Sequence, residues 1–257
     1  MNTNRQNNPK VTLVGAGPGD IELLTIKGLK AIQKADVILY DALVNEELLN
    51  EAPNAEKIFV GKRRGFKAYS QEEINRLIVD KAFLSGNVVR LKGGDSFVFG
   101  RGSEELHYVE AFGIETEVIP GISSSISVPA LAGIPVTHRG VSNSFFVLSG
   151  TLSNGELNPE IKVATKSSGT VVILMGISKL NEIVEIYKNY GKENEAIAII
   201  YNGSLPTQST VVGTIDSISE IAEANKNSGP GIIVIGSVVE ISAIYNDSSY
   251  LFEKIVL

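Results

Sequence analysis

Short apolar runs that alternate with helix-like stretches constrain the fold of this chain more than any other feature. In the first half these runs are rich in valine and isoleucine and show no regular polar alternation. Strands of that kind are typical of a parallel sheet that helices cover on both faces. We predict five strands here, at Val11–Val14, Val37–Tyr40, Ile58–Val60, Val88–Leu91 and Thr116–Ile119.

Helix start signals lie between these runs. Thr25 is in position to cap a helix over Ile26–Lys34. Ser70 and Glu73 form the sequence pattern of a capping box for the next helix. Ser103 is expected to open a third helix.

The alternation resumes after a small, serine- and alanine-rich segment that follows Pro120. Val211–Ile215 follows the preceding apolar run so closely that part of this second sheet is expected to be antiparallel. The other strands are expected at Phe145–Leu148, Thr170–Leu174, Ala196–Tyr201 and Ile232–Ile235, with helices at Asn181–Tyr190 and Ile218–Ala224. We therefore predict an α/β protein with a disordered lead at residues 1–10, an N-terminal α/β domain at 11–121 and a C-terminal α/β domain at 122–257.

Composition excludes several classes of function. The chain has no cysteine, so it has no disulfide, thiol nucleophile or Fe–S cluster, and with only two histidines no metal site is expected. A net charge of −6 disfavours nucleic-acid binding. No apolar run approaches the ~20 residues that span a bilayer, and the polar N-terminus is not a secretory signal. We expect a cytoplasmic protein without membrane or nucleic-acid partners.

Glycine or a charged residue follows nearly every predicted strand. Ligands of open α/β sheets bind beyond the carboxyl ends of the strands, and glycine lets a ligand approach bare backbone. The repetition therefore predicts a binding cleft. The segments concerned are GAGPGD at 15–20, Asp41, GKRRG at 61–65, GGD at 93–95, PGISS at 120–124, and the glycine-containing pairs at 149–150, 175–176 and 202–203.

The first of these loops has a second interpretation. GAGPGD resembles the dinucleotide fingerprint G-x-G-x-x-G, and Asp41 matches the acid that binds the ribose. However, Asp20 occupies the third glycine position, Pro18 has no N–H to offer a pyrophosphate, and the helix cap is delayed to Thr25. A nicotinamide or flavin site is therefore the weaker hypothesis.

The chain resembles the tetrapyrrole methylase family, and within it the uroporphyrinogen-III C-methyltransferase branch that forms precorrin-2. The resemblance runs nearly the whole length and is carried by VGAGPGD, ADVILYD, VGKR, VRLKGGD-F-FGRG, VIPGIS, AGIPVTHRG, MG and NG. It implies a class III methyltransferase-like fold of two α/β domains, with S-adenosyl-L-methionine in the active-site cleft between them. It also implies a homodimer.

The resemblance assigns residues to roles by motif. It implies cofactor contacts at Pro18, Gly93, Gly94, Asp95, Val98, Ser123, Ser124, Met175 and Gly203. It makes Asp41 the candidate base or cation stabiliser, and Lys62 the candidate proton donor or carboxylate clamp. The substrate is a macrocycle with eight carboxylates, which cations would bind. The candidates for those contacts are Arg63, Arg64, Arg101, His138 and Arg139, and Lys62 to Arg64 form a basic cluster.

The implied reaction is methylation at rings A and B in turn, through precorrin-1 to precorrin-2, which feeds siroheme and cobalamin biosynthesis. Two departures leave alternatives open: Ala42 stands where the family commonly has arginine, and Ser96 where it has proline. The alternatives are a sister tetrapyrrole or precorrin methyltransferase and a non-catalytic, cofactor-binding regulator.

Overall fold

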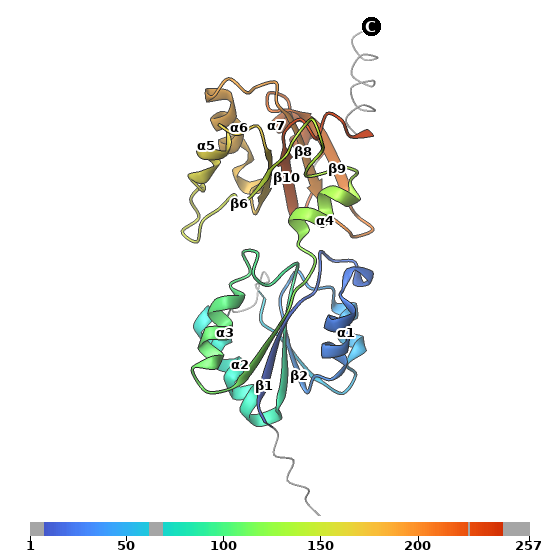
Figure 1. Ribbon diagram of the computed structural model, residues 1–257, viewed down its shortest axis with the longest axis vertical. Helices are drawn as coiled ribbons and strands as arrows, with labels where there is room; N and C mark the ends of the chain where they lie inside the picture. The colour runs from blue at the N-terminus through green and yellow to red at the C-terminus, as the bar shows by residue number, and fades with distance from the viewer. Residues whose placement is uncertain (1–7, 62–68, 226, 244–257) are drawn as a thin grey trace, which may run out of the picture. The chain divides into compact units, whose positions relative to one another are not determined.

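The structure, a computed structural model, describes residues 8–61, 69–225 and 227–243 and divides the chain into two compact units, Met1–Ser123 and Ser124–Leu257. This division falls two residues after the predicted boundary. Each unit contains a five-stranded sheet with helices packed on it (Figure 1). The predicted α/β class with two domains is confirmed.

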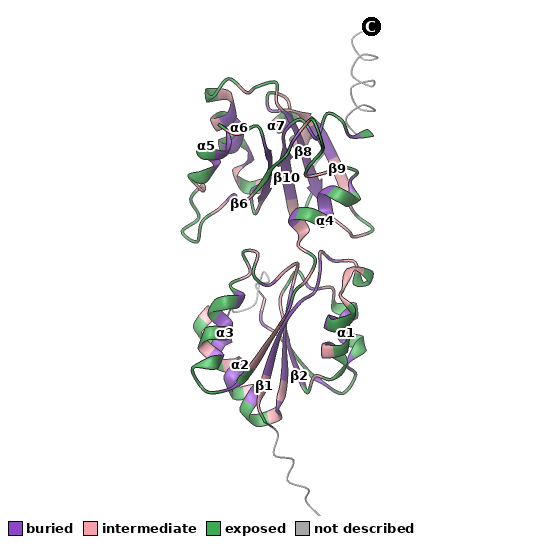
Figure 2. Ribbon diagram, viewed as in Figure 1, coloured by how far each residue is buried: buried purple, intermediate pink, exposed green. Residues whose placement is uncertain are grey.

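The sheet of the first unit is parallel throughout, as the apolar runs predicted. Its strand order is β3-β2-β4-β1-β5, so β4 lies at the centre. The central strands are buried along nearly their whole length (Figure 2). The strands are β1 (Lys10–Gly15), β2 (Val37–Tyr40), β3 (Glu56–Phe59), β4 (Asn87–Lys92) and β5 (Glu115–Ile119).

Helices cover both faces of this sheet. On one face Ile32 of α1 (Ile26–Gln33) packs with Ile38 and Val89, in a cluster that also takes in the 3-10 helix η2 (Glu46–Glu51). On the other face α2 (Gln71–Ser85) and α3 (Gly102–Glu110) pack against the same strands (Figure 1). A short 3-10 helix, η1 (Ile21–Leu23), precedes α1.

Two of the three predicted helix starts are confirmed. The Thr25 hydroxyl accepts a hydrogen bond from the Gly28 N–H at 3.0 Å, and Ser70 and Glu73 form the full capping box. The prediction that Ser103 opens α3 is wrong. The helix begins at Gly102, because the Gly102 N–H donates to the Ser96 carbonyl and Arg101 takes a left-handed conformation with φ 58° at the N-cap.

The second sheet is mixed, as the close spacing before Val211 predicted. Its order is β6-β7-β10-β8-β9; β6 and β7 are parallel, and β10 is antiparallel to both β7 and β8. The carboxyl ends of β6, β7 and β8 therefore lie at one edge. The strands are β6 (Phe145–Ser149), β7 (Thr170–Leu174), β8 (Ala196–Tyr201), β9 (Ser209–Thr214) and β10 (Gly231–Ile235).

α4 (Ser124–Leu131) packs on one face of this sheet, where Val128 joins Val172, Ile200 and Val234. The opposite face is covered by α5 (Glu160–Ala164), α6 (Leu180–Asn189) and α7 (Ile218–Asn225), with the 3-10 helix η3 (Ile177–Lys179) before α6. Among the described helices, none combines the length and the apolar character needed to cross a bilayer.

Candidate functional site

The loops after β1, β4 and β5 meet as bare backbone at the carboxyl edge of the first sheet. Gly17 and Gly94 form an antiparallel bridge, with N···O distances of 3.2 and 2.7 Å. A Cβ atom on Gly121 would lie 2.1 Å from the Gly94 carbonyl oxygen, and one on Gly15 would lie 2.5 Å from the Gly121 nitrogen. Only glycine fits at these crossings, which explains why the motifs are so rich in it.

Asp95 ties these loops together. Its Oδ1 accepts a hydrogen bond from the Phe97 N–H at 2.8 Å, and its Oδ2 accepts one from the Gly121 N–H at 3.0 Å. The Asp95 carbonyl accepts a hydrogen bond from the Val98 N–H. Five of the six predicted cofactor residues of this unit, Pro18, Gly93, Gly94, Asp95 and Val98, thus belong to two loops that the Gly17–Gly94 bridge joins.

The loop after β2 adjoins the same edge and carries Asp41. A Cβ atom on Gly93 would lie 2.9 Å from the Leu43 Cβ, and the Asn45 amide donates to the Gly19 carbonyl at 3.0 Å. Asp41 therefore lies on the edge that holds the glycine loops. The predicted residues Lys62, Arg63 and Arg64 lie outside the described residues.

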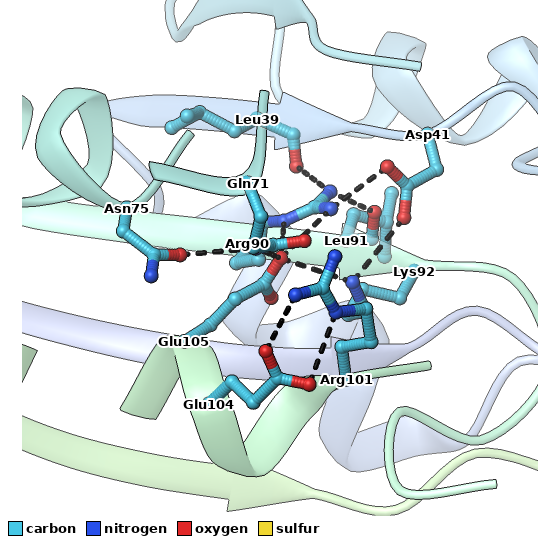
Figure 3. A network of polar contacts seen from close by, with 10 residues as sticks. All are labelled: Leu39, Asp41, Gln71, Asn75, Arg90, Leu91, Lys92, Arg101, Glu104 and Glu105. Atoms are coloured by element: carbon cyan, nitrogen blue, oxygen red, sulfur yellow. Dashed lines mark hydrogen bonds and ion pairs between the residues drawn. The ribbon is translucent and has the colours of Figure 1, made fainter. Parts of the chain in front are cut away.

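Asp41 is the partly exposed end of a buried ionic network (Figure 3). The Arg90 guanidinium donates to Asp41 Oδ1 at 2.7 Å, and the Lys92 ammonium lies 3.5 Å from Asp41 Oδ2. Both cations also contact Glu105 Oε1, at 3.2 and 3.1 Å. The side chains of Arg90 and Glu105 are 2% exposed and that of Lys92 is 7% exposed, whereas that of Asp41 is 28% exposed.

The network is neutral, with two cations and two carboxylates. Charges buried to this degree persist only when they are paired and hydrogen-bonded. Arg90 meets this need further by donating to the main-chain carbonyls of Leu39 and Leu91. Arg90, Lys92 and Glu105 were not among the site residues predicted from the sequence. The available signal was a pair of cations in the central apolar run VVRLK, which must find partners when the strand is buried.

The remaining substrate candidates are exposed. Arg101 pairs with Glu104 through two hydrogen bonds, of 3.0 and 2.6 Å, and this hydrogen bonding lowers the pKa of the Glu104 carboxyl. His138 and Arg139 belong to the second unit, in a turn closed by hydrogen bonds between the main chains of His138 and Ser142. The side chains of all three are accessible to a ligand from solvent.

The remaining predicted cofactor residues lie at strand ends of the second unit or beside the start of α4, where Ser123 is the last residue of the first unit. Met175 follows β7 with φ 55°; the residue is 52% exposed, and its carbonyl accepts a hydrogen bond from the Thr151 hydroxyl. Gly203 follows β8, and a Cβ atom there would lie 2.4 Å from Val128 of α4. Ser124 is the first residue of α4, and Ser123 precedes it.

These edges have features that suit an organic ligand. Across the described ranges, no three His, Asp or Glu side chains gather in a way that could hold a metal ion. The edges offer loops whose main chains lie close together, the half-exposed residue Met175 and a partly exposed carboxylate at Asp41. Backbone polar groups beside apolar surface are typical of sites that bind nucleosides and similar molecules.

Residues 10–219 match the family model of the Tetrapyrrole (Corrin/Porphyrin) Methylases. The chain belongs to the tetrapyrrole methylases. This tetrapyrrole methylase is 49% identical over 235 residues to the uroporphyrinogen-III C-methyltransferase of Methanocaldococcus jannaschii, covering 90% of this chain and 97% of that protein. It is 43% identical over 242 residues to the siroheme synthase of Actinobacillus pleuropneumoniae, covering 92% of this chain but 49% of the synthase.

A solved structure of uroporphyrin-III C-methyl transferase from Thermus thermophilus, complexed with S-adenyl homocysteine, matches the tetrapyrrole methylase with a TM-score of 0.78. The two sequences are 36% identical, and the match covers 90% of this chain and 99% of that one.

Proposed function

We propose that this tetrapyrrole methylase uses S-adenosyl-L-methionine to methylate uroporphyrinogen III at rings A and B, through precorrin-1 to precorrin-2. The observation that carries the proposal is the 49% identity to the Methanocaldococcus jannaschii enzyme along nearly the full length of both chains. The siroheme synthases among its relatives support the proposal that the product is a precursor of siroheme. The family, which includes corrin methylases, supports cobalamin as a second end product.

The cofactor is assigned to the glycine-rich loops of the first unit and to Ser123, Ser124, Met175 and Gly203. Its sulfonium supplies an electrophilic methyl group. Gly93 and Gly94 bring main-chain polar groups to this edge, where an adenosine can form hydrogen bonds with them. The close crossing of Gly15, Gly94 and Gly121 supports this assignment, because it brings the main chains of three loops together at one edge.

The pyrrole carbon of the substrate is intrinsically nucleophilic, so the residues of the chain act mainly by alignment and electrostatics. Asp41 is proposed to stabilise the cation that follows methyl transfer or to remove its proton, and its partial exposure supports this role. Lys62 is proposed as proton donor or carboxylate clamp. The residues proposed to bind substrate carboxylates are Arg63, Arg64, Arg101, His138 and Arg139. Their side chains can donate hydrogen bonds to carboxylates, and arginine does so in bidentate fashion.

Anaerobic incubation with methyl-labelled S-adenosyl-L-methionine and uroporphyrinogen III tests the proposal. Mass spectrometry of the product is expected to count two added methyl groups. One methyl group would indicate a reaction that stops at precorrin-1. None would contradict the proposal and favour a sister methyltransferase with another precorrin substrate, or a protein that binds the cofactor without turnover.

We also propose a homodimer in the cytoplasm. The family resemblance supports the dimer, and the lack of cysteine is compatible with a reducing compartment. Light scattering coupled to size exclusion is expected to give twice the 27.5 kDa of one chain. Cell fractionation is expected to recover the protein with soluble cytoplasmic enzymes. A monomer mass at micromolar concentration would contradict the dimer.

A further inference from the structure

We propose that Glu105 is a positioning residue for Asp41 and acts through Arg90 and Lys92. The inference deepens the proposed function and rests on it, because it takes Asp41 as the group that meets the reacting macrocycle. Glu105 itself is buried and does not reach the substrate. Its effect on methyl transfer is to fix where the Asp41 carboxylate lies.

Three donors converge on one oxygen of Glu105. Oε1 accepts from Arg90 Nε at 3.2 Å, from Lys92 Nζ at 3.1 Å and from Gln71 Nε2 at 3.1 Å (Figure 3). Gln71 belongs to α2, so its hydrogen bond anchors the carboxylate of α3 to α2. Gln71 is itself held by a hydrogen bond that it donates to Asn75 at 3.0 Å. Glu105 thus joins α2, α3 and the central strand β4 at one point.

The same two cations hold Asp41 from the other side. Arg90 contacts Asp41 Oδ1 and Lys92 contacts Asp41 Oδ2, so each cation lies between the two carboxylates. Within the described residues, the carboxylates within ion-pair distance of Lys92 Nζ are Asp41 and Glu105. A lysine on a four-carbon stem has many rotamers, and a second fixed partner selects one of them.

Charge balance gives Glu105 its second effect. Without the Glu105 charge, one carboxylate would face two buried cations, and Asp41 would be the nearest group able to neutralise both. Its carboxylate would then be drawn toward the interior and away from solvent, where its side chain is now 28% exposed. With Glu105 in place, its carboxylate balances part of the charge of Arg90 and Lys92, and the Asp41 carboxylate stays partly exposed to solvent.

The decisive comparison is Glu105→Gln against Glu110→Gln, on the same helix but outside the network. Glu110 is exposed and accepts a hydrogen bond from Thr116. Displacing a reacting group by about 1 Å costs up to about a hundredfold in rate. We expect Glu105→Gln to lower kcat for the first methyl transfer at least about tenfold, while the KM for S-adenosyl-L-methionine and the affinity for S-adenosyl-L-homocysteine stay within about twofold. Glu110→Gln is expected to match the wild type.

A double-mutant cycle separates positioning from a general structural role. If Glu105 acts through Asp41, Glu105→Gln in an Asp41→Asn background lowers kcat by less than about threefold, because the group it positions is already disabled. An additive loss in that background overturns the inference.

Removing a buried charge can also prevent folding, so a second variant is needed. Glu105→Asp keeps the charge and withdraws the carboxylate by one methylene. It is expected to fold, to bind S-adenosyl-L-homocysteine as the wild type does and to lose kcat about fivefold or more. Wild-type kcat in Glu105→Asp overturns the inference and leaves the proposed function intact. Failure of the wild-type enzyme to methylate uroporphyrinogen III would instead overturn the proposed function and, with it, this role for Glu105.

Discussion

At the scale of single residues, the first sheet carries charges where strands normally hold only apolar side chains. Arg90 and Lys92 occupy β4, the central strand of the first sheet, and are almost fully buried. Asp41, by contrast, could be predicted from sequence because it follows a strand directly. Glu105 could not, because its helix position gives no sign that it faces Arg90 rather than solvent, and the neighbouring Glu104 is exposed.

Asp41→Asn is expected to lower turnover about a hundredfold, because the amide cannot stabilise a cation or take up a proton as the carboxylate does. Lys62→Met is expected to act in the same direction. Binding of S-adenosyl-L-homocysteine, measured by calorimetry, should remain close to that of the wild type. A variant that loses cofactor affinity but keeps its turnover at saturation would contradict the role given to that residue.

Gly121→Ala is expected to lower the free energy of unfolding by about 1–3 kcal/mol, because the added methyl would meet the Gly94 carbonyl oxygen. It should also weaken binding of S-adenosyl-L-homocysteine, because the loops after β1, β4 and β5 must separate. Gly133→Ala is the control: a φ of 72° is unfavourable for alanine, but the added methyl group meets nothing within 4 Å. Urea titration of both variants, with binding measured alongside, checks the difference. Equal cofactor affinity in the two would argue against a ligand at this crossing.

At the scale of elements, the strands were predictable because each has a short run of mostly apolar residues. The predicted bounds Val37–Tyr40, Thr170–Leu174 and Ala196–Tyr201 match the structure at both ends. α4 was not predicted. Its sequence SSISVPAL has small residues, an internal Pro129 and no clear apolar stripe, and packing of Val128 against the sheet stabilises it instead. Local sequence does not reveal a helix that depends on such a contact.

The edge strand β5 provides a pH-dependent test. Lys27 and then Lys10 hydrogen-bond to Glu117 and lower the pKa of its carboxyl below the ordinary 4.5. A lowered pKa stabilises the folded state above about pH 4.5, and this stabilisation is lost as the pH falls through the lowered value. Glu117→Gln should therefore cost up to about 1 kcal/mol at pH 7 and nothing in strong acid. Urea titrations across this pH range measure the difference, and 1 M salt should remove most of it. A cost that is the same at pH 2 would contradict the ionic origin.

At the scale of the whole molecule, the sheet of the first unit is parallel and that of the second is mixed. In both units, loops that contain glycine follow the carboxyl ends of parallel strands. Sequence predicted this recurrence from the glycines alone. It could not predict which loops touch, because contacts such as that between Gly17 and Gly94 depend on the strand order.

Ligand-dependent stability discriminates between the cofactor hypotheses for the whole protein. A ligand that binds only the folded state at 100 times its Kd adds about 2.7 kcal/mol to the free energy of unfolding. S-adenosyl-L-homocysteine is expected to raise Tm by several degrees, whereas NADPH at the same concentration should leave it unchanged. Thermal denaturation monitored by fluorescence measures both. Stabilisation by NADPH alone would revive the dinucleotide interpretation of GAGPGD.

The position of β10 has a consequence for synthesis on the ribosome. Within the part of the chain that the structure describes, this strand is the last, yet it pairs with β7 on one side and β8 on the other. Until Gly231–Ile235 has emerged, the strands β6 and β7 remain apart from β8 and β9 in the growing polypeptide. The first unit can fold during translation, but the second cannot complete its sheet until β10 is made. Until then, the backbone edges of the apolar strands β7 and β8 that later pair with β10 are open. A nascent chain at this stage most needs protection from aggregation.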